Sequence, residues 1–242
     1  MPTRGKLLAL EGIDGAGKHT HVEMLSRALE RRGVDYCHFS FPRYQSFFGR
    51  AVARYLTGEF GRLADVDPHL SALLYAGDRL EAKPELESAL ASGRTVLADR
   101  YVPSNLAHQG ARVEASRRTE FLDWVRELEY GIYGLPHEDL VIYLRIPVEE
   151  ATRRMANRAK KLSQDIQESD LRHLEQAAEV YDSLAASEGW AVIEGFDRAT
   201  NQPRPTGEIH QEILRLWENR LAGNQTAQAK RSGEDTTETG KR

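Results

Sequence analysis

Glycines and a lysine near the N-terminus recur at a spacing that suits phosphate binding. Residues 12–18 read GIDGAGK and match the pattern G-x-x-x-x-G-K. Glycines let the backbone curl so that consecutive N–H groups point into one concavity, where they bind phosphate oxygens. We therefore expect the phosphates of a nucleotide to be held by Gly12, Ile13, Asp14, Gly15, Ala16, Gly17, Lys18, His19 and Thr20.

The position after Lys18 departs from the usual pattern. A serine or threonine there normally places its hydroxyl on Mg²⁺, whereas this chain has His19 followed by Thr20. Mg²⁺ prefers oxygen ligands, so His19 is a poor substitute. Either Thr20 or water takes this role, or carboxylates and substrate phosphates hold the metal.

A charged pair follows a second apolar run. TVLAD at 95–99 reads as a buried strand, and Arg100 comes directly after Asp99. Ligands of parallel α/β sheets bind beyond the carboxyl ends of the strands. Asp99 could approach a metal through water, and the planar guanidinium of Arg100 suits a phosphate. The alternative is an ordinary surface ion pair.

Short apolar runs alternate with helical patterns along the chain, which predicts a parallel sheet covered on both faces. Strands are expected at 6–11, 35–41, 95–99, 140–146 and 190–194. A helix beginning near Asp67 is expected to bury Leu70, Leu73, Leu74, Gly77 and Leu80, and Pro84 is expected to open a separate short helix. A long helix over 168–187 is expected to turn inward Leu171, Leu174, Ala178, Tyr181 and Leu184.

Composition and charge exclude several classes of protein. The 242 residues are 40% hydrophobic and carry a net charge of −4, whereas a nucleic-acid coat would be basic. No apolar run approaches the roughly 20 residues that cross a bilayer, and the lone Cys37 excludes a disulfide framework. We expect a cytoplasmic protein with one domain over 1–221 and a disordered tail over 222–242, which has no apolar side chain larger than that of alanine.

Five motifs together resemble the thymidylate kinase family, whose members phosphorylate dTMP from ATP. They are EGIDGAGKHT at 11–20, FPRY at 41–44, LLYAGDR at 73–79, DRYVPSNLAHQG at 99–110, and RRMANRAKK at 153–161 followed by DIQE at 165–168. The glycine loop alone indicates only an NTPase, whereas DRY-x-x-S with FPRY and the Tyr-x-x-x-Arg pair is specific to this family. The resemblance implies a P-loop NTPase fold of class α/β, with a five-stranded parallel sheet, helices on both faces and a small helical lid at about 153–168. It also implies ATP as phosphoryl donor, Mg²⁺, a homodimer and a role in dTTP biosynthesis.

The resemblance also implies a set of substrate contacts. Tyr75 and Arg79 are four residues apart on one helix, so they project from the same face and could stack on a base and donate to its carbonyl. In the family, equivalents of Arg43 and Arg100 hold the acceptor phosphate. The amide of Asn105 could donate to or accept from a pyrimidine edge, or belong to a structural loop. The full expected set is Phe41, Arg43, Tyr75, Arg79, Arg100, Ser104, Asn105, His108 and Asp165.

His108 departs from the family, which commonly has a tyrosine that screens the sugar 2′ position. An imidazole is smaller, so rejection of ribonucleotides is expected to be less strict. A packed loop histidine is the alternative.

A basic run at 153–161 is expected to begin the lid. Because the glycine loop contains no arginine, the resemblance implies that the lid supplies one to the transferred phosphoryl group, with Arg158 preferred over Arg154; a solvated helix face is the alternative. The expected catalytic residues are Lys18, Arg100, Arg158, Arg154 and Asp14. The expected metal ligands are Asp14, Asp99 and Glu168.

Two other functions fit the same sequence. His108 allows a kinase for another pyrimidine monophosphate, and His19 allows a catalytically weak P-loop nucleotide-binding relative. The presence of Lys18, Arg79 and Arg100 together argues against the weak relative.

Overall fold

The structure, a computed structural model, describes residues 3–62, 65–159 and 171–221. Its centre is strand β1 (Leu7–Glu11), in which every residue is buried. The other strands of the parallel sheet are β2 (Tyr36–Ser40), β3 (Thr95–Asp99), β4 (Leu140–Arg145) and β5 (Ala191–Glu194). The strand order is β2-β3-β1-β4-β5, with Leu8 of β1 opposite Leu97 and Leu140. The predicted five-stranded parallel sheet is confirmed.

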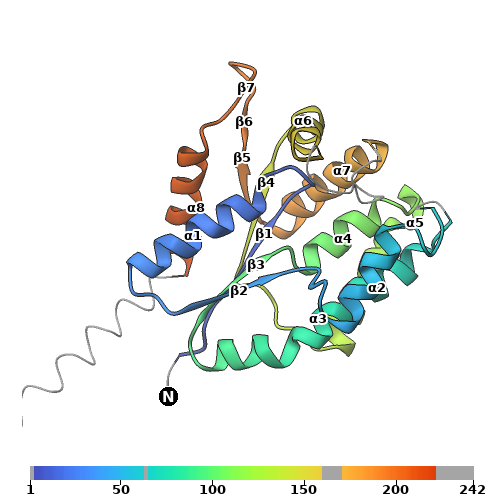
Figure 1. The fold of residues 1–242 in the computed structure, drawn as a ribbon, viewed down its shortest axis with the longest axis horizontal. Helices are drawn as coiled ribbons and strands as arrows, with labels where there is room; N and C mark the ends of the chain where they lie inside the picture. The colour runs from blue at the N-terminus through green and yellow to red at the C-terminus, as the bar shows by residue number, and fades with distance from the viewer. Residues whose placement is uncertain (1–2, 63–64, 160–170, 222–242) are drawn as a thin grey trace, which may run out of the picture.

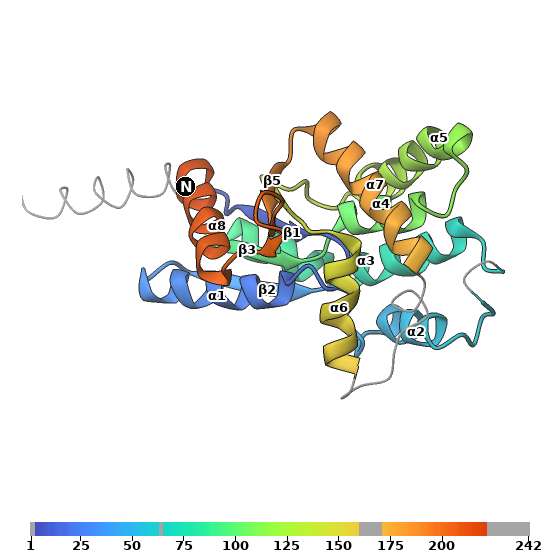
Figure 2. The ribbon, with the colours of Figure 1, turned by 90° about the horizontal axis from the view of Figure 1, so that it is seen from above.

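Helices cover both faces of the sheet (Figure 1). On one side lie α1 (Lys18–Arg31) and α8 (Thr206–Arg220), and on the other lie α3 (Pro68–Ala91), α4 (Val102–Gly110) and α7 (Leu171–Glu188). Figure 2 shows the same division from above. The remaining elements are α2 (Phe47–Leu56), α5 (Ala115–Arg126), the π-helical turn η1 (Glu127–Ile132), α6 (Val148–Ala159) and the hairpin of β6 (Phe196–Asp197) and β7 (Gln202–Pro203).

Helix α3 differs from the prediction in its length and in its buried face. It begins after the expected cap, Asp67, whose side chain accepts from the His69 N–H at 2.7 Å, but it continues through Pro84 as one helix. Leu70, Leu73 and Leu80 are 48%, 36% and 36% exposed, so the prediction was wrong at these three positions, whereas Gly77 is buried as expected and Leu74 is partly buried. Small and charged residues face inward instead, because this side of the helix packs closely on its neighbours and borders a cavity. They are Ser71, Ala72, Ala76, Gly77, Asp78, Arg79 and Ala82.

Two further differences concern helices. Helix α2, which packs on α3, was not expected from the sequence. Leu171 is 50% exposed rather than turned inward, because it stands at the first residue of α7, ahead of the buried stripe that begins with His173 and Leu174. Residues 160–168 of the expected lid and the expected tail at 222–242 lie outside the described residues. No helix in the described part of the chain is long and apolar enough to span a membrane.

Candidate active site

The glycine loop joins β1 to α1 in a conformation that requires glycine. Gly12, Gly15 and Gly17 have φ angles of 144°, 84° and 98°, which side chains rarely tolerate. A Cβ on Gly15 would lie 2.5 Å from the carbonyl oxygen of Ala151 in α6. The loop ends at Gly17, directly before α1 begins at Lys18. At this N-terminus the free N–H groups and the helix dipole favour an anion.

Lys18 is folded back across this loop. Its Nζ donates to the carbonyl oxygens of Gly12 at 2.8 Å and Ile13 at 3.0 Å. Burial, and then the nearby Arg100, lower the pKa of Lys18 to about 8. The ammonium is thus held at the loop and is poised to bind phosphate oxygens.

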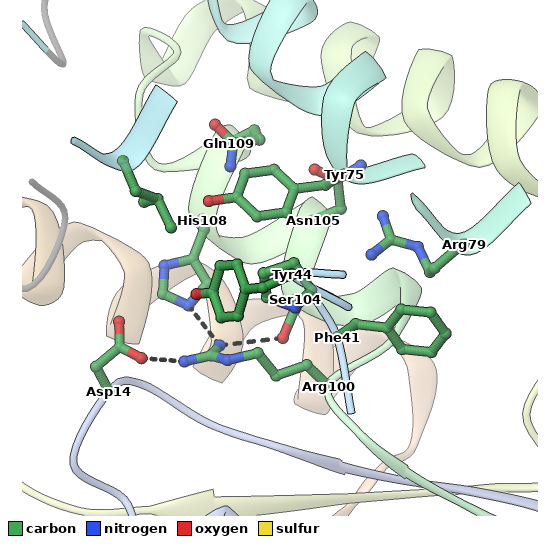
Figure 3. Close-up of a pocket in the computed structure, with 12 residues that line it drawn as sticks. Asp14, Phe41, Tyr44, Tyr75, Arg79, Arg100, Ser104, Asn105, His108 and Gln109 are labelled. Carbon is green, nitrogen blue, oxygen red and sulfur yellow. Dashed lines mark hydrogen bonds and ion pairs between the residues drawn. The ribbon is translucent and has the colours of Figure 1, made fainter. Parts of the chain in front are cut away.

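Arg100 stands where β3 ends and is held by three partners (Figure 3). Its guanidinium donates to Asp14, to Ser104 Oγ at 3.2 Å and to His108 Nε2 at 3.1 Å. Burial would raise the pKa of Asp14, but the Arg100 guanidinium beside it holds that pKa well below its usual value. Asp14 is thus an ionised anchor for Arg100, and it ties the glycine loop to the end of β3.

His108 is buried, and its hydrogen bonds define its tautomer. A guanidinium can only donate, so Nε2 of His108 accepts from Arg100, which leaves the proton on Nδ1. Nδ1 lies 3.3 Å from Nε2 of the buried His173. Burial, and then Arg100, lower the pKa of His108 well below its usual value, so the ring is neutral. His108 is both packed and exposed to the cavity it lines, so the two sequence interpretations are not exclusive.

Glu11 is a site residue that the sequence reasoning missed. It is fully buried and accepts hydrogen bonds from the Tyr101 N–H at 2.7 Å, from Ser104 Oγ at 2.6 Å and from the Tyr181 hydroxyl at 3.0 Å. Burial raises the pKa of Glu11, although the hydrogen bonds from Ser104 and Tyr101 act against it. The glutamate fixes the start of α4, including the Ser104 hydroxyl. A charged residue at the end of an apolar run, directly before Gly12, was the available signal.

Arg43 follows a cis bond between Phe41 and Pro42. Its backbone N–H donates to Asp78 Oδ2 at 2.7 Å, and its guanidinium lies 3.5 Å from Asp78 Oδ1 and 3.4 Å from Glu85. Asp78, almost fully buried on α3, also accepts from Ser46 Oγ at 2.6 Å. This aspartate, which the sequence reasoning did not single out, therefore anchors the FPRY segment.

A cavity opens between the FPRY segment, α3, α4 and the glycine loop (Figure 3). Seven of the expected substrate residues line it: Phe41, Tyr75, Arg79, Arg100, Ser104, Asn105 and His108. Arg43 does not line it, and Asp165 lies outside the described residues. Tyr44 and Gln109 line it as well and were not expected. The cavity thus runs from Asp14 and Arg100 at the loop to Tyr75 and Arg79 on α3.

Arg79 and Asn105 share a buried partner. Arg79, only 2% exposed, donates from Nε and Nη2 to the carboxylate of Glu129 at 2.5 and 2.7 Å. Asn105 Nδ2 donates to the same carboxylate at 2.7 Å. Burial would lower the pKa of Arg79, but Glu129 raises it, so the guanidinium stays charged.

Arg154 of α6 lies against the glycine loop. Its Nε donates to Glu150 at 2.6 Å, and its Nη1 donates to the Ala16 carbonyl at 3.5 Å. Arg158 belongs to the same helix one turn later, but its side chain lies outside the described residues, as does Glu168.

Asp99 is the carboxylate that fits a Mg²⁺ ion at the loop. It is buried at the end of β3, and the exposed His19 is 3.7 Å away, beyond hydrogen-bond distance. Asp14, by contrast, is engaged by Arg100. Within residues 3–62, 65–159 and 171–221, no three His, Cys, Asp or Glu side chains form a group that could hold a metal. Asp99 is thus the expected metal ligand among the described residues that no arginine engages.

The glycine loop between β1 and α1, at the centre of a parallel sheet, defines the class of P-loop nucleotide-binding proteins. The family model for thymidylate kinase matches residues 10–213, and the chain belongs to the thymidylate kinase family. It is 36% identical to the thymidylate kinase of Mycobacterium tuberculosis strain H37Rv over 188 residues, which are 76% of this chain and 87% of the relative.

Two further relatives lie in other kingdoms. The human thymidylate kinase is 34% identical over 153 residues, which are 63% of this chain and 66% of that protein. The structure of thymidylate kinase from Candida albicans superposes with a TM-score of 0.71 at 18% identity, covering 90% of this chain and 93% of that one, which shows the shared fold.

Proposed function

We propose that the protein transfers the γ-phosphoryl group of ATP to dTMP, giving dTDP for dTTP biosynthesis in the cytoplasm. The observation that carries this proposal is the arrangement of one cavity. Arg100 lies at the end next to the glycine loop, and Tyr75, Arg79 and Asn105 lie at the other end, on α3 and α4. A nucleoside monophosphate placed with its base at Tyr75 directs its phosphate toward the loop.

The residues divide the binding between the two nucleotides. The loop amides and Lys18 hold the phosphates of ATP, and Arg100 holds the acceptor phosphate by charge-assisted hydrogen bonds. Arg43 assists from the FPRY segment after a rearrangement, since its side chain faces Asp78 and Glu85 rather than the cavity. Asp14 positions Arg100 for this task.

Charge neutralisation supplies the catalysis. Phosphoryl transfer needs positioning more than covalent chemistry, and a nucleotide phosphate is already an anionic nucleophile near neutral pH. Mg²⁺, held by Asp99 and the nucleotide phosphates, supplies charge stabilisation when bound. Lys18 and an arginine of the lid at 153–168 add to it, with Arg158 as the first choice and Arg154, already beside the loop, as the second.

A coupled assay of ADP release over dTMP, dUMP, UMP, dCMP and CMP tests the activity. We expect dTMP to give the highest kcat/KM. If another pyrimidine monophosphate gives the highest kcat/KM, that nucleotide would replace dTMP as the proposed substrate, which is the alternative that His108 allows. ATP binding without ADP release for any of the five would make the protein a nucleotide-binding relative without this activity.

We further propose that the protein works as a homodimer. Leu70, Leu73 and Leu80 are exposed along α3, where solvation of large apolar side chains is unfavourable. A second copy of the chain would cover this leucine face, in line with the homodimer that the family resemblance implies.

A further inference from the structure

Glu129 is a fully buried carboxylate behind the α3 end of the cavity, and it does not line the cavity itself. It belongs to the π-helical turn η1, a rare conformation that is frequent at functional sites. Its carboxylate accepts two hydrogen bonds from Arg79, at 2.5 and 2.7 Å, and one from Asn105 at 2.7 Å. Glu129, which lies outside the cavity, thus holds both of the polar side chains that are expected to contact the base.

These contacts decide which way the amide of Asn105 is turned. Nδ2 has two hydrogens, and it donates them to the Ala72 carbonyl at 3.1 Å and to Glu129 at 2.7 Å. A carbonyl and a carboxylate can only accept, so the amide nitrogen must face them. Asn105 Oδ1 is buried and has no hydrogen-bond partner among the described residues. Asn105 lines the cavity, so the atom it offers a ligand is an acceptor.

Arg79 provides a hydrogen-bond donor next to the acceptor of Asn105. Its Nε and Nη2 are taken by Glu129, and its Nη1 makes no hydrogen bond within the described part of the chain. Figure 3 shows the guanidinium beside Tyr75 and Asn105. A guanidinium can only donate, so this end of the cavity presents a donor and an acceptor together.

That pair matches one kind of pyrimidine edge. Thymine and uracil carry a carbonyl acceptor at position 4 and a donor at N3, which complement Arg79 and Asn105. Cytosine carries an amino donor at position 4 and an acceptor at N3, so both contacts would oppose like with like.

We propose that Glu129 is a positioning residue that selects the thymine and uracil edge over the cytosine edge. Its carboxylate holds the Asn105 amide in one orientation and the Arg79 guanidinium in one place. Without it only the Ala72 carbonyl still holds the amide nitrogen, so the amide can turn over more readily and present its NH₂ to a cytosine N3. This inference rests on the proposed dTMP kinase activity.

The test compares Glu129→Gln with the wild-type protein, because glutamine keeps the shape of glutamate but can donate to Asn105. Glu138→Gln is the matched control, since Glu138 is hydrogen-bonded to Tyr130 outside the cavity. Steady-state kcat and KM are measured for dTMP and dCMP, and affinity for a fluorescent ATP analogue reports an intact donor site. Glu129→Asp, which keeps the charge on a shorter side chain, is measured in parallel.

We expect wild-type kcat/KM to favour dTMP over dCMP by a factor on the order of 10³ or more, because a mismatched base leaves buried polar groups unpaired. Glu129→Gln should lower this ratio at least tenfold, mostly through KM, while ATP affinity and the control variant's ratio stay unchanged. Glu129→Asp should lower it less.

A folded Glu129→Gln or Glu129→Asp variant that loses activity equally on both substrates would overturn the inference, because a merely structural role leaves the ratio intact. Loss of ATP binding in both variants would overturn it too, since the carboxylate would then be needed for the fold. If the wild-type protein does not phosphorylate dTMP, the proposed function fails instead, and the variants are not needed to show it.

Discussion

Single side chains in this site are held in place by acidic partners. Asp14 anchors Arg100, Asp78 anchors the backbone of Arg43, and Glu11 anchors the hydroxyl of Ser104. A buried carboxylate that accepts several hydrogen bonds has few alternative positions, so the groups bonded to it are preorganised. We therefore expect the proposed catalysis to depend on these acidic residues as well as on the arginines.

The lowered pKa of Lys18 predicts a pH dependence for ATP use. In the free protein the pKa of Lys18 is about 8, so its side chain is a charged ammonium below that pH and loses its charge above it. Because kcat/KM reports the free enzyme, kcat/KM for ATP should fall as the pH rises through about 8. Rates measured between pH 6.5 and 9.5 check this, with Mg²⁺ and dTMP saturating.

Lys18→Arg is the control for that measurement. A guanidinium does not deprotonate in this range, so the variant should be slower at every pH and show no fall near pH 8. The same fall in both proteins would assign the titration to another group.

At the scale of elements, the glycine loop and α6 are built to fit each other. Gly15 lies so close to Ala151 that a side chain would push the two apart, and Arg154 reaches from α6 to the loop carbonyl of Ala16. A movement of α6 should therefore be transmitted to the glycine loop, which we propose holds the phosphates of ATP.

Gly15→Ala tests this contact. The substitution adds a Cβ at 2.5 Å from the Ala151 carbonyl oxygen and at a φ of 84°, so both sterics and backbone strain oppose it. We expect KM for ATP to rise at least about tenfold and the Tm to fall by several degrees, by a loss of about 1–3 kcal/mol. Gly33→Ala is the control, because it also has a positive φ but no atom within 4 Å of the added carbon; it should lower the Tm without changing KM.

The basic residues at the end of α6 allow a test of the proposed lid arginine. An arginine on the transferred phosphoryl group is worth about 10³ to 10⁵ in rate. Arg158→Ala should therefore lower kcat by about 10³ and change KM for dTMP much less. An unchanged kcat would remove Arg158 from this role, and the same steady-state measurement on Arg154→Ala would then test the second choice.

The strands and helices differ in how well the sequence predicted them. The strands of the central sheet are recognisable because both faces are covered, which leaves nearly continuous apolar runs such as Leu7–Leu10. The buried face of α3 was misread in part, because Leu70, Leu73 and Leu80 were taken as inward, while of the small residues only Gly77 was. Glu129 was not predicted because a buried ion pair joins residues 50 positions apart, and no local pattern encodes it.

At the scale of the whole molecule, the fold brings together cations from distant parts of the chain. The net charge of −4 gives no sign of this, since Arg79 and Arg100 come from different elements and line one cavity, while Lys18 lies across the glycine loop next to it. A mildly acidic protein can thus be locally suited to anionic nucleotides.

The leucine face of α3 predicts the oligomeric state. Leu70→Glu with Leu73→Glu places two charges on this face, so a dimer formed through it should separate, and light scattering should give half the wild-type mass. Leu171→Glu, an equally exposed leucine on α7, should leave the mass unchanged. A wild-type monomer, or a double variant that stays dimeric, would contradict the homodimer through α3.

Analysis of the products formed from ATP and dTMP tests the central claim most directly. Nucleotides separated by ion-exchange chromatography after partial conversion should show dTDP and ADP in equal amounts, with no inorganic phosphate. This result would show that dTMP, and not water, accepts the phosphoryl group, as the assignment of the cavity to dTMP predicts. ADP that appears with inorganic phosphate and without dTDP would show that water is the acceptor, and it would contradict the assignment of the cavity to dTMP.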